Sequence, residues 1–129
     1  MPMASSLPIP TDAELALLQV LWTHGPSTVR EVQQHFDRGY TTVLKQLQIM
    51  HDKGLVHRDE SSRAHVYRAA VEADATQRRL IDDLAERAFG GSAQSLVLQA
   101  LDTSRIDTDE LEAIRAIIQD ALDDTPNDS

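Results

Sequence analysis

Polar and apolar residues follow a helical period along much of this chain, beginning at Thr11. The order Thr11-Asp12-Ala13-Glu14 is a capping box, in which the threonine hydroxyl accepts a hydrogen bond from the first helical turn and the glutamate accepts one from the threonine amide. Leucine, valine and tryptophan residues between Leu15 and Trp22 then form a broad apolar face. Because Gly25-Pro26 does not continue a helix, the pattern predicts one helix that ends before His24.

Two further helices are expected before residue 55. Thr28 and Glu31 repeat the capping box and introduce a short helix with one apolar stripe, made of Val29, Val32 and Phe36. The third helix opens near Tyr40 or Thr41 and closes at Gly54, where a lysine-glycine pair stops it. Spacings of four and three place its apolar residues on one face, namely Val43, Leu47 and Met50.

The opposite face of the third helix carries hydroxyl, amide and amino groups. These side chains are Thr41, Thr42, Lys45, Gln46 and Gln48. Threonine offers a hydrogen bond and a methyl group to thymine, glutamine can pair with adenine, and lysine suits guanine or a phosphate. Any surface helix exposes such residues, so the two capped helices before it and the segment after it decide between a DNA-reading helix and an ordinary solvated one.

An extended segment follows Gly54 and reverses direction once. It starts at Leu55-Val56, turns around residues 60–63, and returns from Ala64 to Arg68, which predicts a β-hairpin. Arg63 at the turn is the candidate for a phosphate or minor-groove contact, with Arg58 and His65 beside it. The alternative is a solvated, charge-balanced hairpin, because Asp59 and Glu60 are neighbours. Three helices and a hairpin in this order predict a winged helix that binds DNA.

The second half of the chain contains three amphipathic helical patterns. They cover about residues 74–89, the segment that Ser92 caps, and about residues 108–122, with Gly90-Gly91 between the first two. Such short helices have little capacity to bury their apolar stripes alone. The sequence therefore favours pairing with a second copy, the alternative being that the helices fold back on the winged unit. The residues assigned to dimerisation are Leu80, Leu84, Leu96, Val97, Leu101, Leu111, Ile114 and Ile118.

The net charge of −9 over 129 residues is unfavourable for binding to DNA, but its distribution is uneven. Residues 38–68 hold six basic against three acidic side chains, a balance of +3, whereas residues 72–129 have a balance of −9. One end of the chain is therefore suited to DNA and the other is not. A protein-interaction adaptor that never binds DNA is the competing hypothesis, because it accounts for the overall acidity.

Several kinds of chemistry are not expected. The chain has no cysteine, which excludes disulfides, thiolate metal sites and a cysteine nucleophile. Its five histidines show no ligand spacing, although His57 and His65 can face each other across the hairpin. The acidic runs resemble helix termini and solvated faces rather than a catalytic site, so no enzyme, cofactor or metal is expected. Without an apolar span or an export signal, we expect a cytoplasmic protein that does not insert into the membrane.

The order of these motifs resembles the BlaI/MecI penicillinase repressor family of bacterial transcriptional regulators. The similarity covers residues 11 to about 122 and rests on segments that lie in the family's order. These are Thr11-Asp12-Ala13-Glu14 with Leu21-Trp22, Thr28-Val29-Arg30-Glu31-Val32, Tyr40-Thr41-Thr42-Val43, Lys53-Gly54-Leu55-Val56, Arg63-Ala64-His65-Val66-Tyr67, and Phe89-Gly90-Gly91-Ser92 with Leu96-Val97-Leu98. The resemblance adds Thr28 and Tyr40 to the expected DNA-binding residues.

The resemblance implies a winged-helix domain, expected over residues 11–71, and a helical dimerisation domain, expected over 72–122. The proline-rich start at 1–10 and the polar tail at 123–129 are expected to be disordered ends. The resemblance also implies a homodimer that represses from a palindromic operator in double-stranded DNA. In the characterised branch a membrane metallopeptidase sensor, encoded nearby, triggers cleavage of the repressor at an Asn-Phe bond. The matching bond here is Gln99-Ala100, where alanine replaces the aromatic residue. Copper sensing by the cysteine cluster of another branch is excluded.

Overall fold

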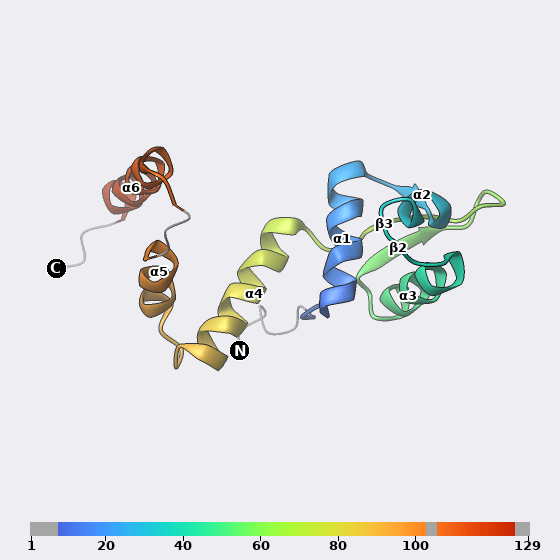
Figure 1. Cartoon of the computed structure of the whole chain (residues 1–129), viewed down its shortest axis with the longest axis horizontal. Coiled ribbons are helices and arrows are strands. Elements are labelled where there is room, and N and C mark those ends of the chain that lie inside the picture. The colour runs from blue at the N-terminus through green and yellow to red at the C-terminus, as the bar shows by residue number, and fades with distance from the viewer. Residues whose placement is uncertain (1–7, 103–105, 126–129) are drawn as a thin grey trace. The chain divides into compact units, whose positions relative to one another are not determined.

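The computed structural model describes residues 8–102 and 106–125, and in this part of the chain helices predominate over one small antiparallel sheet (Figure 1). The elements are α1 (Asp12–His24), β1 (Ser27–Thr28), α2 (Val29–Gln33), α3 (Tyr40–Asp52), β2 (Val56–Asp59), β3 (Val66–Ala69), α4 (Ala73–Ala88), α5 (Ala93–Leu101) and α6 (Thr108–Asp124). The order of helices and hairpin confirms the predicted fold class, a winged helix followed by three helices.

Capping boxes start the first two helices as the sequence predicts. The Thr11 hydroxyl accepts from the Glu14 amide at 3.2 Å, while a Glu14 carboxylate oxygen accepts from the Thr11 amide at 2.9 Å. Thr28 and Glu31 make the same two bonds at 3.2 and 2.8 Å. These side chains satisfy backbone donors that a helix leaves unpaired at its first turn.

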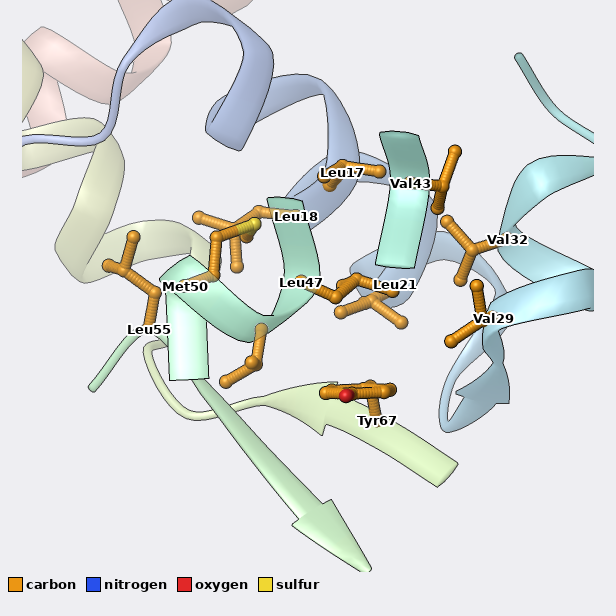
Figure 2. Close-up of a cluster of buried hydrophobic side chains, with 11 residues drawn as sticks. Leu17, Leu18, Leu21, Val29, Val32, Val43, Leu47, Met50, Leu55 and Tyr67 are labelled. Atoms are coloured by element: carbon orange, nitrogen blue, oxygen red, sulfur yellow. The ribbon is translucent and has the colours of Figure 1, made fainter. Parts of the chain in front are cut away.

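The core of the winged unit is formed by one face of each of its helices and by the sheet (Figure 2). α3 contributes its predicted apolar face, Val43, Leu47 and Met50, none more than 2% exposed. The core cluster contains Leu17, Leu18, Leu21, Val29, Val32, Val43, Leu47, Met50, Leu55, Val56 and Tyr67. Because α3 is packed on one side only, its opposite side remains in solvent.

The second helix is shorter than the spacing of its apolar residues predicts. α2 ends at Gln33, and the chain then turns with bonds from the His35 amide to Val32 and from the Phe36 amide to Gln33, both 3.0 Å. These bonds span three residues and belong to a tighter turn than an α-helix. Phe36 therefore lies outside the helix, although its half-buried ring still packs against the core.

The predicted hairpin is present, and a strand that was not predicted joins it. β2 and β3 pair antiparallel, and β1 pairs with the other edge of β3, where Ser27 lies opposite Tyr67 and Thr28 opposite Val66. Two residues between a proline and a helix are too few to show the alternation of a strand. The segment before α2 is thereby fixed to the wing, which we define as β2, β3 and the turn between them.

Gly54 connects α3 to the wing. Its φ of +82° lies in the left-handed region that favours glycine, and the next amide, of Leu55, donates back to the Met50 carbonyl at 2.9 Å. The chain consequently leaves α3 sharply and enters β2 within two residues. This turn places the wing beside α3 in the same folded unit.

The chain forms two compact units, one up to Leu84 and one from Ala85 onward. The predicted domain boundary after residue 71 stays a prediction. Ser92 caps α5 by accepting from the Ser95 amide at 3.1 Å, as expected, and a capping box of Asp107 and Glu110 starts α6. α4 and α6 lie within two residues of their predicted bounds, and α5 begins directly after its predicted cap.

Part of the C-terminal segment assigned to a disordered tail is helical. α6 continues through Asp124, and Thr125 ends it by donating its amide and its hydroxyl to the Ala121 carbonyl at 3.1 and 2.6 Å. At the other end, the first described residues are Pro8 to Pro10. The rest of the predicted ends, residues 1–7 and 126–129, lies outside the described residues.

Candidate nucleic-acid interface

One side of α3 carries the polar residues predicted for DNA. Thr41, Thr42, Lys45 and Gln48 are exposed, while Gln46 is half-buried at the edge of the packed side. We call these four exposed residues the polar face of α3. The apolar residues of the same helix are buried in the core on its opposite side, so packing fixes the position of the polar face. Its hydroxyl, amide and amino groups have no competing role in packing.

The C-terminal end of α3 is attached to α1 by an ion pair that the sequence did not reveal. The Lys53 Nζ donates to Glu14 Oε2 at 2.7 Å, and the Glu14 side chain is 1% exposed against 46% for Lys53. Burial raises the pKa of Glu14, but the hydrogen bonds from Lys53 and Thr11 together with the lysine charge lower it more, and the net pKa lies below the ordinary value. Glu14 therefore caps α1 and also anchors α3.

The N-terminal end of α3 carries a second contact that sequence reasoning missed. The guanidinium carbon of Arg30, on α2, lies 5.3 Å from the centroid of the Tyr40 ring, which is within the range of a cation–π interaction. Tyr40 is 41% exposed and Arg30 is exposed as well. Both side chains belong to the surface beside the polar face of α3 rather than to the core.

The two arginines assigned to DNA in the wing differ in their surroundings. Arg58 Nε donates to Glu60 Oε2 at 2.6 Å, and the Tyr67 side chain and Glu60 raise the pKa of Arg58 above its ordinary value. Arg63 is exposed in the turn and has no ion-pair partner among the described residues. The charge of Arg63 is thus available to a ligand, whereas that of Arg58 is offset.

The turn of the wing is shaped by Asp59, whose carboxylate accepts from the Ser61 amide at 2.9 Å. Hydrogen bonds from the Ser61 side chain and backbone lower the pKa of Asp59. The strand register places His57 opposite Arg68 and Asp59 opposite Val66. His65 lies just before β3 and is not the partner of His57, so the arrangement of two facing histidines does not occur.

A hollow of about 610 Å³ brings several predicted residues together between α2, α3 and the wing. Thr28, Tyr40, Gln48, Arg63 and His65 all line it. The Thr28 hydroxyl is partly committed, because it accepts from the Glu31 amide. Arg30 lines the same hollow and was not among the predicted residues, although its position shortly after a capping threonine is visible in the sequence.

In the second unit, α5 and α6 have no buried residue. Of the residues assigned to dimerisation, Leu84, Val97, Leu111 and Ile118 are exposed, and Leu80, Leu96, Leu101 and Ile114 are half-buried. Other large apolar side chains are exposed too, and these include Leu98, Ile117 and Leu122. The apolar stripes of both helices are therefore open to a partner.

Comparisons with known proteins identify the family. The model of the family described as penicillinase repressor matches residues 10–120. The chain belongs to the penicillinase repressor family. Two relatives are the transcriptional regulator BlaI of Mycobacterium tuberculosis, 34% identical over 81% of this chain and 78% of that protein, and the penicillinase repressor of Bacillus licheniformis, 23% identical over 88% and 92%.

A solved structure supports the fold of this family member. The structure of a MarR family protein from Bacillus stearothermophilus matches 92% of this chain and 76% of that chain with a TM-score of 0.51, at 18% identity. At this identity the similarity concerns the fold alone. The function follows instead from the penicillinase repressor family, whose members are transcriptional regulators and not enzymes.

Within the described residues of this penicillinase repressor homologue, no three histidine, aspartate or glutamate side chains gather as a metal site. Two of the histidines, His24 and His35, form a tilted ring pair whose centroids lie 4.3 Å apart, with an angle of 30° between the ring planes. None of the described helices is long and apolar enough to cross a membrane.

Proposed function

We propose that this chain is a transcriptional repressor that binds a palindromic operator in double-stranded DNA as a homodimer. The observation that carries the proposal is the division of α3, which buries Val43, Leu47 and Met50 and leaves its polar face in solvent. A helix held in this way presents side chains that can enter a major groove, while the wing lies against the neighbouring backbone.

The chemistry of the exposed residues supports specific reading of bases. Thr41 and Thr42 offer hydroxyl and methyl groups, and Gln48 and Lys45 offer donors that reach base edges or phosphates. Of the residues predicted on this face, Gln46 is half-buried and therefore has the least freedom to reach a base or a phosphate. Arg63 and His65 in the wing are assigned to the backbone, and Arg58 contributes less while Glu60 holds it.

The second unit supports the homodimer. α5 and α6 leave large apolar side chains in solvent, among them Val97 at 45%, Leu98 at 58% and Ile117 at 67% exposure. Covering such side chains stabilises an assembly by about 25 cal/mol for each Å² of apolar surface removed from water. A second copy supplies a matching surface by symmetry, and the twofold axis accounts for a palindromic operator.

We further propose that repression is relieved in the cytoplasm by a signal from a membrane sensor peptidase. The bond that corresponds to the family's cleavage position joins Gln99 and Ala100, both exposed in α5. A cut there separates α6 from the winged unit and removes part of the proposed dimer surface. Incubation with a membrane metallopeptidase sensor of the kind that acts on this family, followed by mass spectrometry, tests this step. An intact chain after induction contradicts it.

Titration of the full-length protein against its own upstream region tests the proposed function. Fluorescence anisotropy over a series of salt concentrations is expected to show submicromolar binding that weakens steeply as salt increases. A scrambled duplex of equal length is the control, and specific binding is expected to exceed it by about 1,000-fold or more. Equal affinities, or no salt-sensitive binding below micromolar concentrations, contradict the repressor and favour the protein-interaction adaptor.

A further inference from the structure

The hollow between α2, α3 and the wing has a one-sided charge. Its lining includes Arg30 and Arg63, with His65 beside them, and contains no aspartate or glutamate. The chain as a whole has 21 acidic and 12 basic residues, so a lining with two arginines and no carboxylate is the reverse of the overall charge balance. Such a hollow attracts an anion, since nothing within it offsets the two guanidinium groups.

Both arginines are free to bind. Neither Arg30 nor Arg63 has a carboxylate partner among the described residues, whereas Lys53, Arg58 and Arg115 each form an ion pair. Arg30 lies over the Tyr40 ring at 5.3 Å. A cation–π contact is not a hydrogen bond, so it leaves the guanidinium N–H groups available to an oxygen acceptor.

The position of the hollow indicates which anion it receives. Gln48 belongs both to the hollow and to the polar face of α3, so a duplex lying against that face also passes the mouth of the hollow. Leu44 and Ala64 add apolar surface that suits the sugar on either side of a phosphate. A volume of about 610 Å³ exceeds that of one phosphate group and has room for its neighbouring sugars.

We infer that Arg30 and Arg63 together clamp one backbone phosphate of the DNA in this hollow, with Tyr40 holding Arg30 in place. This inference rests on the proposed function and adds Arg30, which was not among the predicted DNA-binding residues. A phosphate held between α2 and the wing carries no base information, but it fixes how α3 is oriented in the groove. Arg30 is therefore a positioning residue for base recognition.

Arg30→Ala tests the clamp in full-length protein. We expect binding to weaken by about 10-fold on both operator and scrambled duplex, because a charge-assisted hydrogen bond to a phosphate is lost regardless of sequence. The slope of log affinity against log salt is expected to decrease by about 1. Unchanged melting temperature and circular dichroism establish that the variant is folded.

Arg38→Ala is the matched control. Arg38 lies 5.9 Å from the Phe36 ring centroid in a second cation–π contact, but it does not line the hollow. Removing it deletes the same charge, and we expect an effect under about 2-fold. If Arg30→Ala and Arg38→Ala weaken binding equally, the effect is one of net charge and the clamp is overturned.

Neutral methylphosphonate linkages, placed one at a time along the operator, identify the phosphate directly. In the wild-type protein one position in each half-site is expected to weaken binding, and the Arg30→Ala and Arg63→Ala variants are expected to lose sensitivity at that same position. Sensitivity that persists in both variants overturns the clamp while leaving the repressor intact. If the wild-type protein does not bind its operator at all, the proposed function itself has failed.

Discussion

A single carboxylate, that of Glu14, takes part in two tasks at the residue scale. It accepts one hydrogen bond from the Thr11 amide at the start of α1 and another from the Lys53 ammonium group at the end of α3. A carboxylate that is only 1% exposed is tolerated when it is hydrogen-bonded and paired with a cation. The buried charge of Glu14 therefore depends on Lys53. The consequence is that a capping residue of α1 also anchors the C-terminal end of α3, the proposed recognition helix.

Lys53→Ala is expected to lower the free energy of unfolding by about 2 kcal/mol, because it leaves the Glu14 carboxylate buried without its partner. The loss is below the ~3–5 kcal/mol of a fully buried pair, since Lys53 is half exposed. Urea denaturation measures it. Adding Glu14→Gln to Lys53→Ala is expected to recover part of the stability. A double variant less stable than Lys53→Ala contradicts this explanation.

The same pair makes stability depend on pH in acid. The pKa of Glu14 is lower in the folded protein than its ordinary value of 4.5, so folding favours the ionised form. The resulting stabilisation is complete at neutral pH and is lost as the pH falls from about 4.5 through the folded pKa. The difference in urea midpoint between wild type and Glu14→Gln, measured along a pH series, is expected to shrink over that window. A difference that stays constant there contradicts the assignment.

Glu60 is expected to compete with DNA for Arg58. Glu60→Gln removes the carboxylate that Arg58 contacts at 2.6 Å, and we expect operator affinity to rise by about 2- to 5-fold at low salt. Anisotropy titrations measure the gain. In an Arg58→Ala background the same change is expected to give a smaller gain. An equal gain in both backgrounds means that the effect comes from the loss of a negative charge alone.

At the scale of elements, α3 shows what a sequence pattern can and cannot predict. The spacing of Val43, Leu47 and Met50 predicted its buried face, and local capping pairs predicted where α1 and α2 begin. The Glu14–Lys53 pair joins residues 39 apart in the chain, and no local period records such a contact. The Arg30–Tyr40 contact and the strand β1 were missed for the same reason, because each depends on how separate elements meet.

Two substitutions on opposite sides of α3 are expected to separate stability from DNA binding. Leu47→Ala opens a cavity beneath the helix, where Leu47 is fully buried, and should cost about 2–5 kcal/mol of unfolding free energy. Lys45→Ala, on the exposed side, should change stability by less than ~0.5 kcal/mol and weaken operator binding. Urea denaturation and anisotropy distinguish the two effects. Normal DNA binding by Lys45→Ala would remove this residue from the interface.

For the whole molecule, the uneven distribution of charge agrees with the proposed roles of DNA binding for residues 38–68 and dimerisation for residues 72–129. A balance of +3 over residues 38–68 is small for a polyanionic ligand, and residues 72–129 carry −9. In the proposed dimer, two copies on one operator add their contacts, so pairing is expected to offset the weak attraction of a single copy for DNA. On this proposal, the acidic helices contribute to DNA binding without contacting DNA.

Ile118→Asp tests this contribution. Ile118 is 47% exposed on α6, and a carboxylate in an apolar contact between copies is expected to convert the dimer into a monomer. Operator affinity should then fall by about 100-fold, with the folded winged unit unchanged. Light scattering and anisotropy measure the two effects. Asp120→Asn, also exposed on α6, is the control and should leave both values unchanged.

The pairing of β1 with β3 has a consequence for the thermodynamics of recognition. Ser27 and Thr28 attach the start of α2 to the wing through a shared sheet, and Gly54 connects α3 to the same sheet within two residues. The three elements proposed to face DNA, α2, α3 and the wing, therefore belong to one preorganised body, and little conformational entropy is left to lose when the duplex binds. The heat capacity change of binding should thus reflect the surface buried against DNA alone, and it should be smaller than in a protein whose folding is coupled to binding.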